Sequence, residues 1–321
     1  MHYDVFNGDA DGIIALLQLR LFTPRESTLI TGVKRDISLL KQVAEQKDAT
    51  SVTVLDISLE KNKSALESLL ENEVPVFYCD HHRSGEVPHY PHLSTKINLD
   101  AEVCTSLLIN ELLEGKYAYW AIAGAFGDNL DKVANKMALE LGLSEQATAF
   151  LKELGILINY NGYGSSLDDL HIAPSELYKA LLPFTNPFEL IDVLDSPFYQ
   201  LKKGYERDFS HLDAIQPIVN NDICEVYELP CESWARRTSG VFGNDLANRN
   251  PNKAHAVLTL NQSKEDYTVS VRAPLNNRIG ADDICCQFAT GGGRKTAAGI
   301  NQLPLNAVDK FIVALEQYYC K

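Results

Sequence analysis

Short apolar runs alternate with amphipathic segments along the first quarter of the chain. Four segments have the β-branched and aromatic character of strands, at 3–6, 27–31, 51–55 and 74–79. Apolar residues at helical spacing predict helices between them, at 12–22, 37–46 and 62–71. This alternation predicts a mostly parallel sheet with helices on both faces.

The chain becomes mainly helical after residue 102 and changes again near residue 220. Helices are predicted at 119–126, 132–141, 145–158 and 175–182, and a polar, amphipathic connecting helix at 198–215. Strands follow at 224–229, 254–260 and 267–272, with helices at 243–249, 282–289 and 307–318. The predicted fold class is α/β, with a larger N-terminal domain at 1–195, a linker helix at 196–220 and a smaller C-terminal α/β domain at 221–321.

Length and charge restrict the range of functions. A chain of 321 residues is long enough for two domains, and its 45% hydrophobic and 22% charged content is that of an ordinary globular protein. The net charge of −14 argues against avid binding to duplex nucleic acid, because such proteins carry a basic face. An acidic chain is compatible with a carboxylate-rich site that holds divalent cations.

Cysteine usage and the N-terminus bear on the compartment. The seven cysteines form no CxxC pair, which favours reduced thiols over a disulfide framework. The opening residues lack the charged-then-apolar order of a signal peptide, and no apolar stretch is long enough to span a bilayer. We therefore expect a cytoplasmic protein without a membrane segment.

The strand at 74–79 is followed directly by Asp80, His81 and His82. These side chains should lie at the carboxyl end of the strand, where open α/β sheets bind their ligands. Two adjacent imidazoles point in different directions, so one can bind a metal while the other faces a substrate. A lone pair of histidines is more often a surface turn, and the prediction depends on the acids found in similar places elsewhere.

Four other acids also follow predicted strands or apolar segments. Asp9 and Asp11 lie in the glycine-containing loop after the first strand, Asp56 follows the strand at 51–55, and Asp128 ends an apolar segment. Each alone is also explained as a helix cap or a turn acid. Gathered at one sheet edge they would repel one another, because an uncompensated buried charge costs several kcal/mol.

Divalent cations would relieve this repulsion. Mixed carboxylate and imidazole ligands suit Mn²⁺ or Mg²⁺ better than structural zinc, which favours thiolates. Two such ions about 3.5–4 Å apart would activate a bridging water and bind both oxygens of an in-line phosphoryl displacement. The pattern therefore predicts a metal-dependent phosphoryl hydrolase.

These motifs, in this order, resemble the DHH phosphoesterase superfamily, which is named after the triplet seen here as Asp80-His81-His82. The segment Asn7-Gly-Asp-Ala-Asp-Gly is similar to its first motif, with the spacing of the RecJ-type nucleases. The segment Gly291-Gly-Gly-Arg-Lys-Thr-Ala-Ala-Gly resembles the glycine-rich signature of the DHH-associated domain, which accompanies RecJ nucleases and the nanoRNase/pAp-phosphatase group. The resemblance spans nearly the whole chain.

The resemblance implies a role for each motif residue. It places Asp9 on one metal ion and Asp11 on the other, with Asp56 bridging the two. His82 would face the scissile phosphate, and Asp80 would support the ligating imidazole from behind; these two are the predicted catalytic residues. The complete set of implied metal ligands is Asn7, Asp9, Asp11, Asp56, His81 and Asp128.

Two positions depart from the family pattern. Asn7 stands where the first motif usually carries His or Asp, and a neutral amide oxygen is a weaker ligand. Arg294 stands where the glycine signature usually continues with His, and a guanidinium can bind a phosphate through two hydrogen bonds. The predicted substrate-binding residues are Arg272, Gly292, Gly293 and Arg294, although the glycines are also typical of a loop and Arg272 of a solvated surface charge.

The expected function is hydrolysis of short nucleotide phosphodiesters or nucleotide monophosphoesters, such as oligonucleotides, dinucleotides or pAp, with two divalent cations, Mn²⁺ ahead of Mg²⁺. The acidic chain favours a short substrate over processive exonuclease work. One alternative is a polyphosphate or phosphoanhydride hydrolase. Another is a nucleotide-binding regulatory protein with impaired catalysis, for which Asn7 and Arg294 are the supporting features. A homodimer is left open.

Overall fold

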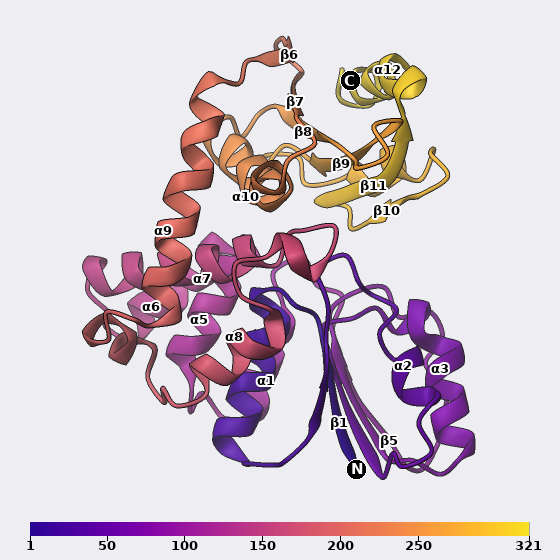
Figure 1. Ribbon diagram of the computed structural model, residues 1–321, viewed down its shortest axis with the longest axis vertical. Helices are drawn as coiled ribbons and strands as arrows, with labels where there is room; N and C mark the ends of the chain where they lie inside the picture. Colours follow the sequence, from indigo (N-terminus) through magenta and orange to yellow (C-terminus); the bar gives the residue numbers. More distant parts are fainter. Residues whose placement is uncertain (321) are drawn as a thin grey trace. The chain divides into compact units, whose positions relative to one another are not determined.

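The computed structural model describes residues 1–320 and divides the chain into two compact units, residues 1–204 and the residues from 205 onward. The boundary falls within helix α9 (Pro197–Phe209). Each unit contains one β-sheet with helices packed against it (Figure 1). The predicted α/β class, with a mostly parallel first sheet and a second α/β part, is confirmed.

The first unit is built on a parallel sheet of order β2-β1-β3-β4-β5. Its strands are β1 (His2–Phe6), β2 (Thr28–Ile30), β3 (Ser51–Leu55), β4 (Val76–Asp80) and β5 (Leu93–Ile97). Phe6 pairs with Leu55, and Leu55 pairs with Cys79. The carboxyl ends of β1, β3 and β4 therefore lie next to one another at one edge of the sheet.

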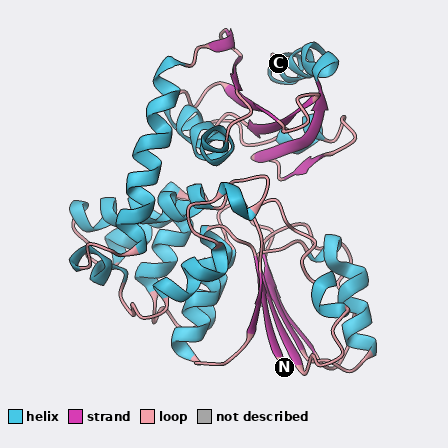
Figure 2. Ribbon diagram, in the orientation of Figure 1, coloured by secondary structure: helices cyan, strands magenta, loops and turns pink. Residues whose placement is uncertain are grey.

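Helices cover both faces of this sheet, with α2 and α3 on one face and α1, α5 and α8 on the other (Figures 1 and 2). The α-helices are α1 (Ala10–Phe22), α2 (Lys41–Ala44), α3 (Leu59–Glu71), α4 (Thr105–Leu112), α5 (Ala118–Gly127), α6 (Asp131–Glu140), α7 (Glu145–Asn161) and α8 (Pro174–Leu181). Two 3-10 helices follow α7 and α8, η1 (Leu167–Asp169) and η2 (Pro187–Asp192).

Alternation along β1 explains how both faces are buried. Tyr3 and Val5 belong to the apolar cluster that includes residues of α2 and α3, such as Val43. Successive side chains of a strand point to opposite faces, so Asp4 and Phe6 face the other layer. There the ring of Phe6 lies 5.9 Å from that of Tyr178 in α8.

Two elements differ from the sequence-based prediction for local reasons. The helix predicted at 37–46 is only the short α2, because the Asn62 side chain donates to the carbonyl of Ile37 at 2.6 Å and accepts from the amide of Leu40 at 3.1 Å. These bonds hold the preceding residues in a turn. Strand β5 was not predicted, because it is a partly exposed edge strand that mixes polar and apolar residues.

The second unit contains a six-stranded sheet of order β10-β11-β9-β8-β7-β6, in which only β7 and β8 pair in parallel. Its strands are β6 (Pro217–Asn220), β7 (Cys224–Leu229), β8 (Ala254–Leu260), β9 (Asp266–Arg272), β10 (Gly291–Gly293) and β11 (Ala297–Pro304). Its helices are α10 (Ser233–Arg249), α11 (Ala281–Cys285) and α12 (Val308–Tyr319), with η3 (Ser210–Ala214) and η4 (Leu305–Ala307).

The two faces of this second sheet have separate apolar clusters. Phe242 and Leu246 of α10 pack with Val257 of β8 on one face. Phe311 and Leu315 of α12 belong to the larger cluster on the other face, as does α11. The glycine segment predicted as a loop is the edge strand β10, because Gly292 pairs with Gly299 across the ladder.

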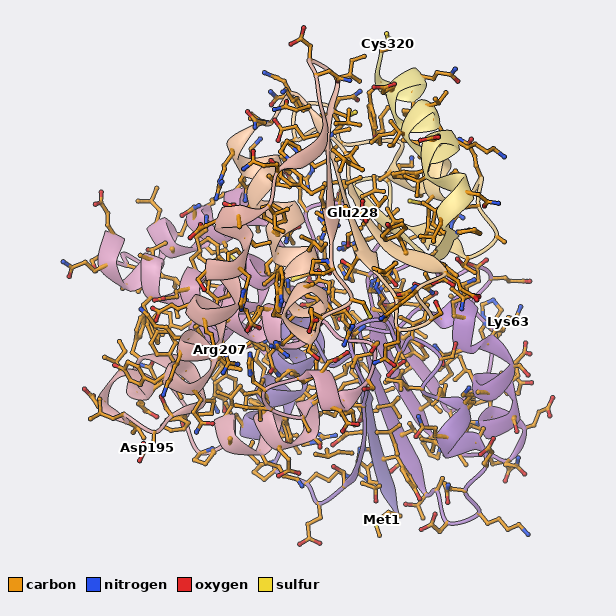
Figure 3. The ribbon with its side chains drawn as sticks, turned by 45° about the horizontal axis from the view of Figure 1, so that its top comes forward. Met1, Lys63, Asp195, Arg207, Glu228 and Cys320 are labelled. Atoms are coloured by element: carbon orange, nitrogen blue, oxygen red, sulfur yellow. The ribbon has the colours of Figure 1, made fainter. Side chains whose placement is uncertain are left out.

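The segment predicted as a linker helix is not helical throughout. Helix α9 ends at Phe209, the 3-10 helix η3 follows, and β6 has already joined the second sheet by residue 217. Lys63 of α3 lies at the right-hand side of the view in Figure 3, and the Arg207 side chain of α9 is largely exposed. No helix within residues 1–320 is both long and apolar enough to cross a membrane.

Candidate metal centre

The edge formed by the ends of β1, β3 and β4 carries the predicted site residues of the first unit. The amide of Asn7 donates to the carbonyl of Leu55 at 3.2 Å, and the amide of Asp56 donates to the carbonyl of Cys79 at 3.0 Å. These bonds continue the sheet by one residue beyond the strands. They place the loop after β1, Asp56 and the Asp80-His81-His82 triplet side by side.

Three carboxylates surround one nitrogen of His81. Nε2 lies 3.3 Å from Oδ1 of Asp56, 3.7 Å from Oδ2 of Asp11 and 4.0 Å from Oδ2 of Asp128. Nδ1 lies 2.8 Å from the carbonyl of Val103, which can only accept, so Nδ1 carries a proton. In the neutral ring Nε2 therefore presents a lone pair to three carboxylates, an arrangement that a cation between them would stabilise.

Backbone amides from a distant part of the chain fix Asp11. Its two carboxylate oxygens accept from the amides of Thr105 and Ser106, each at 2.7 Å, at the start of α4. The Thr105 hydroxyl also donates to Oδ1 of Asp56 at 3.1 Å. The positive end of the helix thus holds two of the carboxylates in place.

Charge on Asp56 is disfavoured by its surroundings. Burial, followed by the negative charges of Asp11 and Asp9, raises the pKa of Asp56 well above its ordinary value. Of the larger contributions to the pKa of Asp56, only the charge of His82 lowers it. The residues present therefore fit a divalent cation bound by oxygen and imidazole ligands, which would supply the missing positive charge.

His82 and Asp80 form a separate pair beside these carboxylates. Nδ1 of His82 lies 2.7 Å from Oδ1 of Asp80, and the His82 side chain remains 28% exposed. The resemblance implied that Asp80 supports the ligating imidazole, but its hydrogen bond goes to His82 and the carbonyl of Val103 orients His81 instead. Asp56, His81 and His82 each offer one atom that could bind a metal ion, and these three atoms lie within 4.8 Å of one another.

Asp9 and Asn7, the other implied ligands, have different partners. Oδ1 of Asp9 accepts from the amides of Asp11 and Gly12, both at 3.1 Å, and so caps α1. Oδ2 of Asp9 forms an ion pair with Lys34, a residue that the sequence analysis did not select. The Asn7 side chain accepts from the amide of Asp9 at 3.2 Å and donates to the carbonyl of Lys34 at 3.2 Å.

The ion pair perturbs both of its members. Burial raises the pKa of Asp9, but the charge of Lys34, its hydrogen bond and the Gly12 amide together lower that pKa by more, so the net shift is downward. Burial acts to lower the pKa of Lys34, but the charge and hydrogen bond of Asp9, together with Tyr163 and Asp128, raise that pKa by more, so the ammonium form is favoured. Asp9 and Lys34 are therefore charged together.

The four predicted substrate-binding residues lie in the second unit. Arg272 is only 9% exposed, and its guanidinium donates to Oδ1 of Asn244 at 2.5 Å and to the carbonyl of Gly240 at 3.0 Å. Gly292 and Gly293 belong to β10, and Gly293 has a φ of +143°. Arg294 begins the turn between β10 and β11, where its amide bonds to the carbonyl of Ala297 at 2.8 Å.

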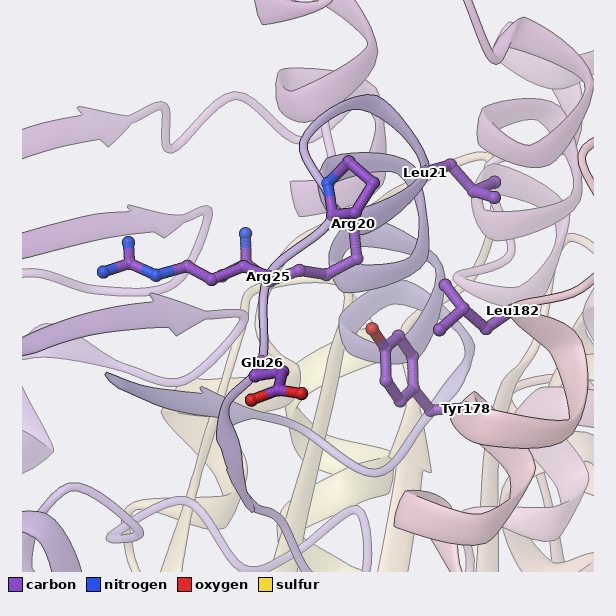
Figure 4. Close-up of a pocket in the computed structure, with 7 residues that line it drawn as sticks. Arg20, Leu21, Arg25, Glu26, Tyr178 and Leu182 are labelled. Atoms are coloured by element: carbon purple, nitrogen blue, oxygen red, sulfur yellow. The ribbon is translucent and has the colours of Figure 1, made fainter. Parts of the chain in front are cut away.

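A cavity of about 500 Å³ lies elsewhere in the first unit (Figure 4). Its lining includes Arg20, Arg25, Glu26 and Tyr178. Arg20 lies in the last turn of α1 whereas Asp11 lies in the first, about 14 Å apart at 1.5 Å per residue. The cavity is therefore separate from the metal centre.

No family model matches the chain, and no curated protein matches its sequence. Solved structures do match it. A crystal structure of exonuclease RecJ bound to manganese matches with a TM-score of 0.61 and 16% identity, over 100% of this chain and 90% of that one.

Two further structures agree. RecJ from Thermus thermophilus in complex with Mn²⁺ matches with a TM-score of 0.62 and 18% identity over 99% of this chain, which spans only 52% of that protein. The pGpG-specific phosphodiesterase PggH from Vibrio cholerae matches with a TM-score of 0.54 and 13% identity, over 100% of this chain and 99% of that one. The chain therefore shares its fold with RecJ and with PggH, in agreement with the predicted resemblance.

Proposed function

We propose that this chain is a divalent-cation-dependent phosphoesterase that hydrolyses short nucleotide phosphodiesters or nucleotide monophosphoesters. The observation that carries the proposal is the position of His81 Nε2, within 4.0 Å of three buried carboxylates. The fold shared with a nuclease and a nucleotide phosphodiesterase supports the phosphoesterase class.

The residues that would hold the cation are those grouped around His81, namely Asp11, Asp56, His81 and Asp128. When bound there, a divalent cation supplies Lewis-acid activation of water and neutralises phosphate charge. Three carboxylates and one imidazole suit Mn²⁺, and RecJ structures hold Mn²⁺. Thr105 and Ser106 keep Asp11 oriented, so the ligands need little rearrangement on binding.

His82 is the residue proposed to act on the substrate directly. Its Nδ1 is held by Asp80, so Nε2 is the nitrogen left for the substrate on this partly exposed ring. With the ring oriented by Asp80, His82 can donate an Nε2 proton to the leaving oxygen or hydrogen-bond a phosphate oxygen. Asp80 is thus a positioning residue for His82.

Substrate length and binding are the finer parts of the proposal. The net charge of −14 disfavours long polynucleotides, since each phosphate must be neutralised by the protein or by ions. Residues 1–195 are assigned the hydrolytic chemistry. Residues 221–321 are assigned binding of the nucleotide or its terminal phosphate, through Arg272, Gly292, Gly293 and Arg294.

A substrate panel tests the proposal. The purified chain is incubated with Mn²⁺ and, separately, with dinucleotides, pAp, cyclic dinucleotides and polyphosphate, and released products are quantified. We expect turnover of a dinucleotide or pAp, lost in Asp11→Asn and kept in the exposed-site control Asp100→Asn. Faster turnover of polyphosphate would favour the phosphoanhydride alternative, and no turnover of any of the four would refute the proposal.

A further inference from the structure

The ammonium group of Lys34 lies in a cage built by three parts of the first unit. Nζ forms an ion pair with Oδ2 of Asp9, donates to Oδ1 of the buried Asn159 at 2.8 Å, and lies 5.4 Å from the centre of the Tyr163 ring. A carboxylate, an amide oxygen and an aromatic face together favour an ammonium ion. An aromatic face is not a ligand for Mn²⁺ or Mg²⁺.

The backbone of Lys34 is fixed as firmly as its side chain. Its amide donates to the carbonyl of Gly162 at 2.8 Å, and its carbonyl accepts from the Asn7 side chain at 3.2 Å. Asn7 therefore uses its amide group to hold the lysine loop. An ionised aspartate at this position could accept from the Asp9 amide but could not donate to the Lys34 carbonyl, as Asn7 does.

Asp9 has both carboxylate oxygens engaged by groups of the chain. One accepts from two backbone amides at the start of α1, and the other is paired with Lys34. The family resemblance places the first of two cations at Asn7 and Asp9. A divalent ion beside Asp9 would meet the lysine charge directly, and like charges at that separation repel strongly in a buried site.

We propose that the Lys34 ammonium takes the place of the first divalent cation, so that this centre binds one ion per chain; the inference deepens the proposed phosphoesterase function. The ion lies among the carboxylates around His81, and Asp9 is neutralised by lysine. Lys34 is 22% exposed and its ammonium has three N–H groups, of which Asp9 and Asn159 take two. The third donates to a non-bridging phosphate oxygen of the substrate.

The number of bound ions tests this inference in the unaltered full chain. Metal-stripped protein is titrated with Mn²⁺ by calorimetry, and the ions retained per chain are counted after dialysis. The electron paramagnetic resonance spectrum then distinguishes an isolated Mn²⁺ from a magnetically interacting pair. We expect one ion per chain with the isolated-ion spectrum, also in the presence of inorganic phosphate. Two ions per chain, or the spectrum of a pair, would overturn the inference.

Variants locate the ion. Asp11→Asn should weaken Mn²⁺ binding by at least ~100-fold, beyond the ~10–100-fold loss seen when groups outside the ligand shell are changed. Asp9→Asn should leave the count at one, because that carboxylate pairs with lysine. Loss of the ion in Asp9→Asn with retention in Asp11→Asn would also overturn the inference.

A second site should appear when the lysine is removed and a ligand is restored. The double variant Asn7→His with Lys34→Ala is expected to bind two Mn²⁺ ions, whereas Lys63→Met, a control at an exposed lysine, should bind one. If the double variant does not fold, the number of Mn²⁺ ions bound by the wild-type chain still decides the inference. Ion counts and substrate turnover are independent measurements: an enzyme with two ions refutes the lysine role alone, and a one-ion protein without turnover refutes only the proposed function.

Discussion

Replacing Asp56 with asparagine should stabilise the metal-free protein. Its carboxylate is buried beside Asp11 and Asp9, and the raised pKa of Asp56 shows that folding disfavours its charge. Asparagine keeps the shape, adopts the positive φ of 59° at this position readily, and can still accept the Thr105 hydrogen bond. The variant therefore removes a destabilising charge with little other change.

The size and sign of the expected Tm change follow from the linkage between protonation and folding. Each pKa unit between folded and unfolded states corresponds to about 1.4 kcal/mol, and each kcal/mol shifts Tm by about 2–4 °C for a unit of roughly 200 residues. Because the folded pKa of Asp56 lies above the unfolded value of 3.8, the penalty is absent below 3.8 and grows as pH rises toward the folded pKa. We expect Asp56→Asn to raise the metal-free Tm at neutral pH, and to raise it less as the pH is lowered toward 3.8.

Asp4 provides a matched control, for which the asparagine variant should lower Tm rather than raise it. The Asp4 side chain is as inaccessible to solvent as that of Asp56. Burial raises the pKa of Asp4, but hydrogen bonds from His2 and Arg20 act against burial and lower this pKa to about 2. A depressed carboxyl pKa contributes stability above the unfolded value of 3.8, and this stability is lost as pH falls through about 2. The difference is worth about 2.5 kcal/mol, so Asp4→Asn should lower Tm by about 5–10 °C.

Thermal unfolding followed by circular dichroism, in EDTA at neutral pH, measures both variants against wild type. Addition of Mn²⁺ should then raise the wild-type Tm, since an ion at 100 times its Kd contributes about 2.7 kcal/mol, and should have little effect on Asp56→Asn. A metal-free Asp56→Asn protein that melts below wild type would show that the acid cluster is internally compensated, and the electrostatic case for a cation would fail.

Three further variants probe other parts of the molecule. His82→Gln should lower kcat by about 10²–10⁴-fold with a smaller change in KM, whereas His89→Ala at an exposed site should not; equal losses in both variants would contradict the role of His82. Gly127→Ala should destabilise the first unit by about 1–3 kcal/mol in urea unfolding, because the new Cβ would lie 2.4 Å from that of Ala10; an unchanged midpoint would contradict this packing. Arg272→Lys should lower the free energy of unfolding of the second unit by about 1.5–3 kcal/mol through lost hydrogen bonds to α10, and an unchanged value would mean that those bonds contribute little.

The sequence predicts the buried strands closely because their pattern and their environment agree. The prediction at 51–55 coincides with β3, and β1 differs by one residue, since both are almost completely buried strands with β-branched and aromatic residues. The edge strand β5 carries no such pattern, because solvent covers much of it. The shortened α2 depends on Asn62, a residue more than fifteen positions away in sequence, so local periodicity could not reveal it.

The candidate site shows the same division between local and distant causes. Strand-end placement was enough to predict that Asp56 and His81 would lie close together, and they do. The amides that fix Asp11 come from Thr105 and Ser106, 94 and 95 residues away, and no motif marks them. Lys34 lies in an irregular loop with nothing in its spacing to indicate that it would reach Asp9.

The backbone of Asp56 points to function independently of its charge. Its φ of 59° lies in the left-handed region, which Asp and Asn adopt more readily than most residues and which costs glycine almost nothing. The hydrogen bond from its amide to Cys79 and the bond from Tyr78 Oη to the Ile57 carbonyl, at 2.9 Å, hold it there. Glycine would satisfy the backbone and remove the disfavoured charge, so on stability alone it is the better residue. A carboxylate whose charge is disfavoured, at a position where glycine would be accommodated, is explained by a need for that carboxylate in binding a cation.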